Sequence, residues 1–103
     1  MNKEDMILIS VDDHTVEPPG MFKGHLPKKY LDDAPRLVHN PDGSDMWKFR
    51  DTVIPNVALN AVAGRPKEEY GYEPVSYEQV RAGCYNVDAR VGDMDVNGVL
   101  GSI

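Results

Sequence analysis

Two side chains near the N-terminus, Asp12 and His14, have the types and spacing of paired metal ligands. They follow residues 6–11, a short apolar run that predicts a strand covered on both faces. Side chains two apart on an extended segment point the same way, with Cα atoms about 6.5–7 Å apart. A carboxylate and an imidazole so placed can bind one divalent ion at about 2.0–2.2 Å. The C-terminal end of such a strand is also where α/β proteins carry active sites.

The same residues also permit a purely structural interpretation. Asp13 or Thr15 could cap a short helix, because their side-chain oxygens accept hydrogen bonds from backbone N–H groups. As a ligand Asp13 is excluded, since on an extended segment it points away from Asp12. Glu17 lies three residues beyond His14 and could accept a hydrogen bond from the N–H of a ligating imidazole. Spacing alone leaves the metal site and the helix cap both open.

The chain after this motif predicts a β-hairpin within a long insertion. Residues 36–39 and 46–50 flank a Pro-Asp-Gly turn, and Trp47 and Phe49 fall on one face of the second run. Residues 21–33 are weakly helical, and we expect a helical turn near 57–62 and a short helix over 76–82. His25 and His39 lie in predicted surface segments, where we expect both to be solvated.

A helix and a second strand are predicted after the insertion. Asn86 is a suitable N-cap for a helix over residues 87–94, which Asn97-Gly98 ends. Val87, Val91 and Met94 form its apolar stripe. Residues 99–103 resemble the opening of a buried strand, and because natural termini are usually polar, we expect a truncated chain.

Composition restricts the function classes. The 103 residues carry 17 Asp and Glu against 11 Lys and Arg, a net charge of -6, which argues against nucleic-acid and anionic membrane partners. No run approaches the roughly 20 apolar residues of a membrane span, and no targeting signal is visible. The single cysteine, Cys84, cannot form an internal disulfide. We expect a soluble, cytoplasmic protein.

Several separated blocks resemble the amidohydrolase-2 family. They are ISVDDHTVEPP at residues 9–19, NAVAGRP at 60–66, GCY at 83–85 and RVGDMD at 90–95. The resemblance implies a (β/α)₈ barrel with one catalytic divalent ion, in a family of hydrolases and nonoxidative decarboxylases (carboxy-lyases). Its first motif is often His-x-His, and Asp12 in the first position resembles the acid-x-His version found among decarboxylases such as the γ-resorcylate enzyme. A carboxylate ligand favours Mn²⁺, with Zn²⁺ as the alternative.

The combined prediction is an α/β fold in which residues 1–103 are one partial domain, the N-terminal portion of a TIM barrel with a β-hairpin insertion after strand 1. Such a barrel needs roughly 250 residues, so this chain supplies about one and a half of eight repeats. The resemblance implies Asp12 and His14 as metal ligands, a small-molecule substrate, and activity only with the remainder of the barrel or a complementing chain, possibly as a homo-oligomer. The alternative is a small α+β protein-binding module that uses the aromatic hairpin face.

Overall fold

The computed structural model describes residues 2–58, 61–71 and 73–103, which form two compact units. The first, here called the terminal unit, joins Met1–Thr15 to Ala82–Ile103. The second, the inserted unit, is Val16–Arg81. The described residues contain two sheets and two α-helices, one sheet and one α-helix in each unit. None of these helices has the length and apolar character needed to cross a membrane.

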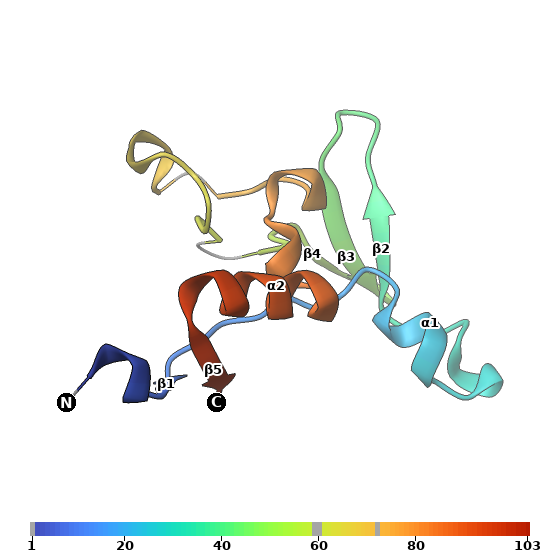
Figure 1. Cartoon of the computed structure of the whole chain (residues 1–103). Helices are drawn as coiled ribbons and strands as arrows, with labels where there is room; N and C mark the ends of the chain where they lie inside the picture. The colour runs from blue at the N-terminus through green and yellow to red at the C-terminus, as the bar shows by residue number, and fades with distance from the viewer. Residues whose placement is uncertain (1, 59–60, 72) are drawn as a thin grey trace. The chain divides into compact units, whose positions relative to one another are not determined.

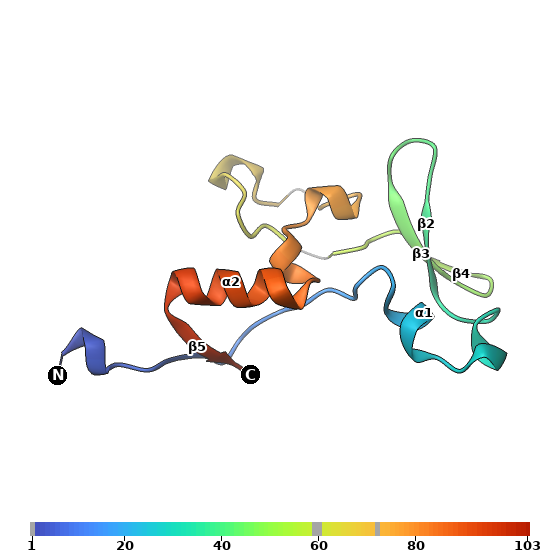
Figure 2. The same cartoon turned by 45° about the vertical axis from the view of Figure 1, so that its right-hand side comes forward.

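The terminal unit contains a parallel pair of strands joined through a helix. Strand β1 (Leu8–Ser10) pairs with β5 (Val99–Ser102), which follows directly after α2 (Val87–Asn97) (Figures 1 and 2). Two short 3₁₀ turns, η1 (Lys3–Asp5) and η5 (Ala82–Cys84), complete the unit. The predicted first strand, the helix after Asn86 and the strand that opens at Val99 are confirmed, with the first strand shorter and the helix longer than expected.

Helix α2 has the predicted caps but not the predicted covered face. The side chain of Asn86 accepts a hydrogen bond from the Ala89 N–H at 3.0 Å, and Gly98 takes the left-handed conformation with φ 67°. Val87 and Val91, however, are 74% and 51% exposed. The less exposed residues of the helix are Ala89, Arg90, Asp93 and Met94.

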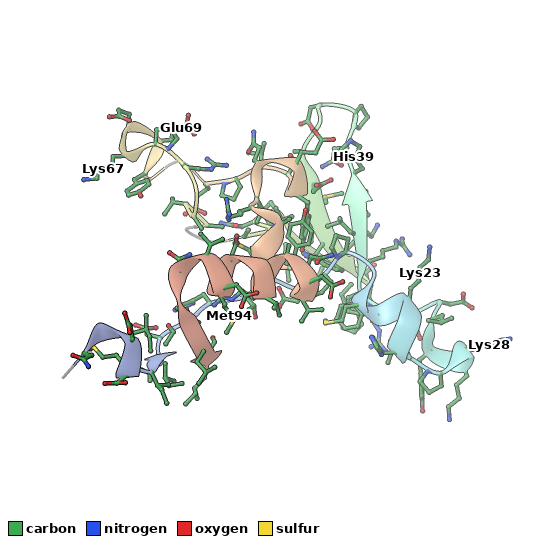
Figure 3. The ribbon with its side chains drawn as sticks, in the orientation of Figure 1. Lys23, Lys28, His39, Lys67, Glu69 and Met94 are labelled. Carbon is green, nitrogen blue, oxygen red and sulfur yellow. The ribbon has the colours of Figure 1, made fainter. Side chains whose placement is uncertain are left out.

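Polar contacts explain why the covered face of α2 differs from the predicted one. Arg90 forms an ion pair within the unit, and Asp93 lies against Gly83 of η5 so closely that any Cβ at position 83 would collide with its carboxylate. Met94 lies on the side of α2 toward β1 and β5 (Figure 3). The predicted stripe was therefore wrong for the two valines, because polar partners and a glycine contact orient this helix.

The inserted unit is built on a three-stranded antiparallel sheet. Strands β2 (Arg36–His39), β3 (Asp45–Phe49) and β4 (Thr52–Ile54) pair in sequence order, so the predicted hairpin is confirmed. Strand β4 was not predicted. Its connection to β3 is only Arg50-Asp51, which lacks the Asn-Gly or Asp-Gly signal of tight hairpins and places Arg50 at φ 53°.

The core of the inserted unit lies under β3. Trp47, Val57, Ala58, Tyr77 and Val80 are buried, and Phe22 of α1 (Met21–His25) meets the Trp47 ring edge-on at 5.8 Å between centroids. Three 3₁₀ turns lie in the connecting segments: η2 (Lys28–Tyr30), η3 (Lys67–Glu69) and η4 (Tyr77–Gln79). The weak helicity predicted for residues 21–33 thus resolves into α1 and η2.

The helix predicted over residues 76–82 is wrong, because the backbone becomes extended at Val80, with φ -96° and ψ 132°. The buried Asp45 side chain accepts the Tyr77 N–H at 2.8 Å, and the chain forms only the single turn η4 there before η5. The helical turn predicted near residues 57–62 includes positions 59 and 60, which lie outside the described residues.

Candidate metal site

Asp12 and His14 converge as their spacing predicted. Asp12 Oδ1 lies 3.4 Å from His14 Nε2, and the two side chains are 90% and 92% exposed at the end of the segment that follows β1. Two ligands each about 2.1 Å from a tetrahedral ion stand about 3.4 Å apart. The separation of the two atoms is therefore compatible with their binding one divalent ion.

The helix-cap interpretation of this motif is contradicted. Residues 13–18 adopt no helix, and the next one, α1, has Gly20 at its N-cap with no side-chain capping bond. The Asp13 carboxylate instead bonds to groups on α2 and β5. Neither Asp13 nor Thr15 therefore caps a helix.

Asp13 ties the end of the first strand to the rest of the terminal unit. Its Oδ2 accepts a hydrogen bond from the Ser102 hydroxyl on β5 and lies 3.0 Å from Arg90 Nη2 on α2. The hydroxyls of Ser102 and Ser10, and then the Arg90 guanidinium, hold the pKa of Asp13 below its usual range. Alternation along the chain predicted only that Asp13 faces away from Asp12. Its partners escaped sequence reasoning because Ser102 lies 89 positions further along.

Asp12 and His14 do not by themselves make up a metal site. Within residues 2–58, 61–71 and 73–103, no group of three or more His, Cys, Asp or Glu side chains is arranged to hold a metal ion. Glu17 belongs to the inserted unit, where its backbone carbonyl accepts the Tyr77 hydroxyl at 2.6 Å. Its predicted hydrogen bond to an imidazole stays a prediction. Asp12 and His14 offer one oxygen and one nitrogen ligand, and further ligands would have to complete the coordination.

The other two histidines differ from each other. His25, at the end of α1, is exposed as expected. His39 is also exposed as expected, with 66% of its side chain accessible, but its Nδ1 additionally lies 2.6 Å from Oδ1 of the buried Asp45, a contact that raises the pKa of His39. Sequence reasoning missed this pair because residues 39 and 45 meet only when the hairpin closes in this register.

Comparison of the chain with models of protein families gives no match, and comparison with curated proteins gives no significant match.

Proposed function

We propose that this chain is the N-terminal part of a metal-dependent amidohydrolase-type enzyme that acts on a small organic substrate. The observation that carries the proposal is the 3.4 Å approach of Asp12 Oδ1 to His14 Nε2 just beyond a strand in a parallel pair. An oxygen and a nitrogen ligand at this separation suit Mn²⁺ or Zn²⁺. The C-terminal end of a parallel strand is the usual active-site position in α/β barrels.

The exposed apolar side chains of the terminal unit support the proposal that it is part of a larger barrel. Parallel strands joined by a helical crossover are normally buried on both faces. Here β1, β5 and their flanking residues keep large apolar side chains exposed, among them Ile7 at 71%, Val11 at 76% and Leu100 at 71%. Such surfaces favour further strands and helices packed around this unit.

Each residue then has a defined role. Asp12 and His14 hold the ion, and Asp13 fixes the end of β1 by its bonds to Ser102 and Arg90. A bound divalent ion supplies Lewis acidity or an activated water, chemistry that serves hydrolysis and nonoxidative decarboxylation alike. Because two ligands bind an ion weakly, we expect these 103 residues to show no turnover by themselves.

Calorimetric titration with Mn²⁺ and Zn²⁺ tests the ligand assignment. We expect weak binding of one ion, lost in both Asp12→Ala and His14→Ala. His25→Ala is the matched control, because it removes an exposed imidazole outside the pair. Binding that persists in the first two variants, or that disappears with His25→Ala, would refute the assignment.

The second candidate is a protein-binding module, favoured by apolar side chains on the edge of the inserted sheet. Val53 and Ile54 of β4 are 46% and 51% exposed, and Phe49 of β3 is 42% exposed. A module should fold cooperatively as a monomer. A barrel part with open strand edges should associate with itself. Sedimentation velocity over a range of concentrations separates the two functions.

A further inference from the structure

We propose that a groove between α1 and the start of β2 binds small amphipathic carboxylates. The groove has a volume of about 370 Å³, within the typical range of small-molecule sites, which is about 300–1,000 Å³. It lies wholly within the inserted unit. The residues that matter for the proposal are Phe22, Lys23, Leu31, Pro35, Arg36 and Leu37.

The floor of the groove is apolar. Phe22, Leu31, Pro35 and Leu37 are each partly exposed, so their apolar surface is available to a ligand. The Phe22 ring is held edge-on against the buried Trp47, which fixes its orientation. Burial of a ligand's hydrocarbon on this surface is favourable by about 25 cal/mol per Å² of apolar area removed from water.

The charged residues that line the groove are both cationic, whereas Asp32 and Asp33, which lie between the lining residues Leu31 and Ala34 in the chain, are exposed and do not line it. Lys23 and Arg36 line it, and no acidic side chain of the described residues does. Figure 3 shows Lys23 rising from α1 beside β2, whereas Lys28 projects at the far end of the segment. Arg36 also lies directly opposite Lys48 in the β2–β3 ladder, a like-charge pair that is unfavourable without an anion nearby.

These cations have no carboxylate partner in the described part of the chain. The ion pairs there include His14–Asp12, His39–Asp45 and Arg90–Asp13. In an acidic protein of net charge -6, two cations that line one apolar groove, Lys23 and Arg36, favour an anion as its ligand. One carboxylate can meet Lys23 and Arg36 while an apolar body rests on the floor.

Titration with 2-naphthoate, followed by NMR shifts in EDTA, tests the groove without any contribution from bound metal. The neutral 2-naphthamide is the matched ligand, since it keeps the ring and loses the charge. We expect the acid to bind several-fold more tightly than the amide and to shift the amide signals of Phe22, Leu31 and Leu37. Lys23→Gln and Arg36→Gln should each weaken the acid about three- to five-fold, as for exposed ion pairs.

Lys67→Gln is the control variant, because Lys67 lies on turn η3, away from α1 (Figure 3). It should leave the affinity for 2-naphthoate unchanged. Equal binding of acid and amide, shifts confined to residues outside the groove, or an equal loss in Lys67→Gln would each overturn the proposal. None of these results bears on Asp12 and His14, which belong to the terminal unit.

Discussion

Asp12 and Asp13, which follow β1, point to opposite sides of the chain and have different partners. Asp12 meets His14, while Asp13 turns to the other side and binds Ser102 and Arg90. The anchored acid limits how far the backbone around Asp12 can move. In the proposed metal site, the fixed position of Asp13 would reduce the entropy that Asp12 loses when an ion binds.

The stability of the terminal unit should fall in acid through Asp13. Its folded pKa is depressed below 3.8, so the contribution is complete above that value and disappears as pH falls through the folded pKa. Asp13→Asn should have a melting temperature that changes less below about pH 4 than that of the parent chain. Circular dichroism melts measure this, with the exposed acid variant Asp95→Asn as control. Parallel acid profiles for the parent and Asp13→Asn would contradict the assignment.

The inserted unit should respond to pH in the opposite sense through His39. The folded pKa of His39 is raised above 6.5 by its bond to Asp45, so this stabilisation is complete below 6.5 and is lost as pH rises through the folded value. Urea unfolding followed by fluorescence of the single tryptophan, Trp47, reports on this unit. His39→Gln retains an N–H donor but has no group that titrates near neutral pH. The free energy of unfolding of this variant should therefore not decline as pH rises above 6.5. An unchanged pH profile in this variant would exclude the pair as its source.

At the scale of elements, the N-terminus of α2 depends on one side chain. Asn86 accepts the Ala89 N–H, and Asn86→Ala should lower the free energy of unfolding of the terminal unit by about 1 kcal/mol. Val96→Ala is a suitable control within the same helix, since Val96 is 88% exposed. Urea titrations measured by far-ultraviolet circular dichroism give both values. A loss in Val96→Ala as large as that in Asn86→Ala would contradict the cap.

The elements with local signals could be predicted from sequence. The apolar run before Asp12, the Pro-Asp-Gly turn, and the Asn86 and Gly98 caps each act within a few residues. Strand β4 could not be predicted, because the turn before it places Arg50 at a positive φ, a conformation that Arg-Asp does not indicate. The helix expected over residues 76–82 stops at Val80, where the backbone is extended, and this segment is held by distant residues: Asp45, which accepts the Tyr77 N–H, is 32 positions away.

The candidate sites, too, could be predicted from sequence only where the residues involved are close together in the chain. The contact between Asp12 and His14 could be predicted from their spacing of two residues, although both lie beyond the end of β1 at Ser10. The partners of Asp13 and the cations around the groove could not, since each depends on which elements meet in three dimensions. The face of α2 shows this well: its valines fit a helical stripe, yet Arg90 and Asp93 lie on the covered side.

At the scale of the molecule, the two units differ in how well they bury their apolar residues. Trp47 and Tyr77 lie in a core within the inserted unit, whereas β1 and β5 are largely exposed. Amide exchange should therefore be fast across Leu8–Ser10 and slow across Asp45–Phe49. Strong protection of β1 in a monomeric sample would contradict the barrel origin and favour the protein-binding module.

The central claim is that Asp12 and His14 share one cation, and paramagnetic broadening by Mn²⁺ tests it most directly. The chain has three histidines, so the imidazole signals of His25 and His39 serve as internal controls. The His14 signals should broaden at the lowest Mn²⁺ concentration, and Asp12→Asn should remove that preference while His14 itself remains. Equal broadening of all three imidazoles, or an unchanged response in Asp12→Asn, would contradict the account.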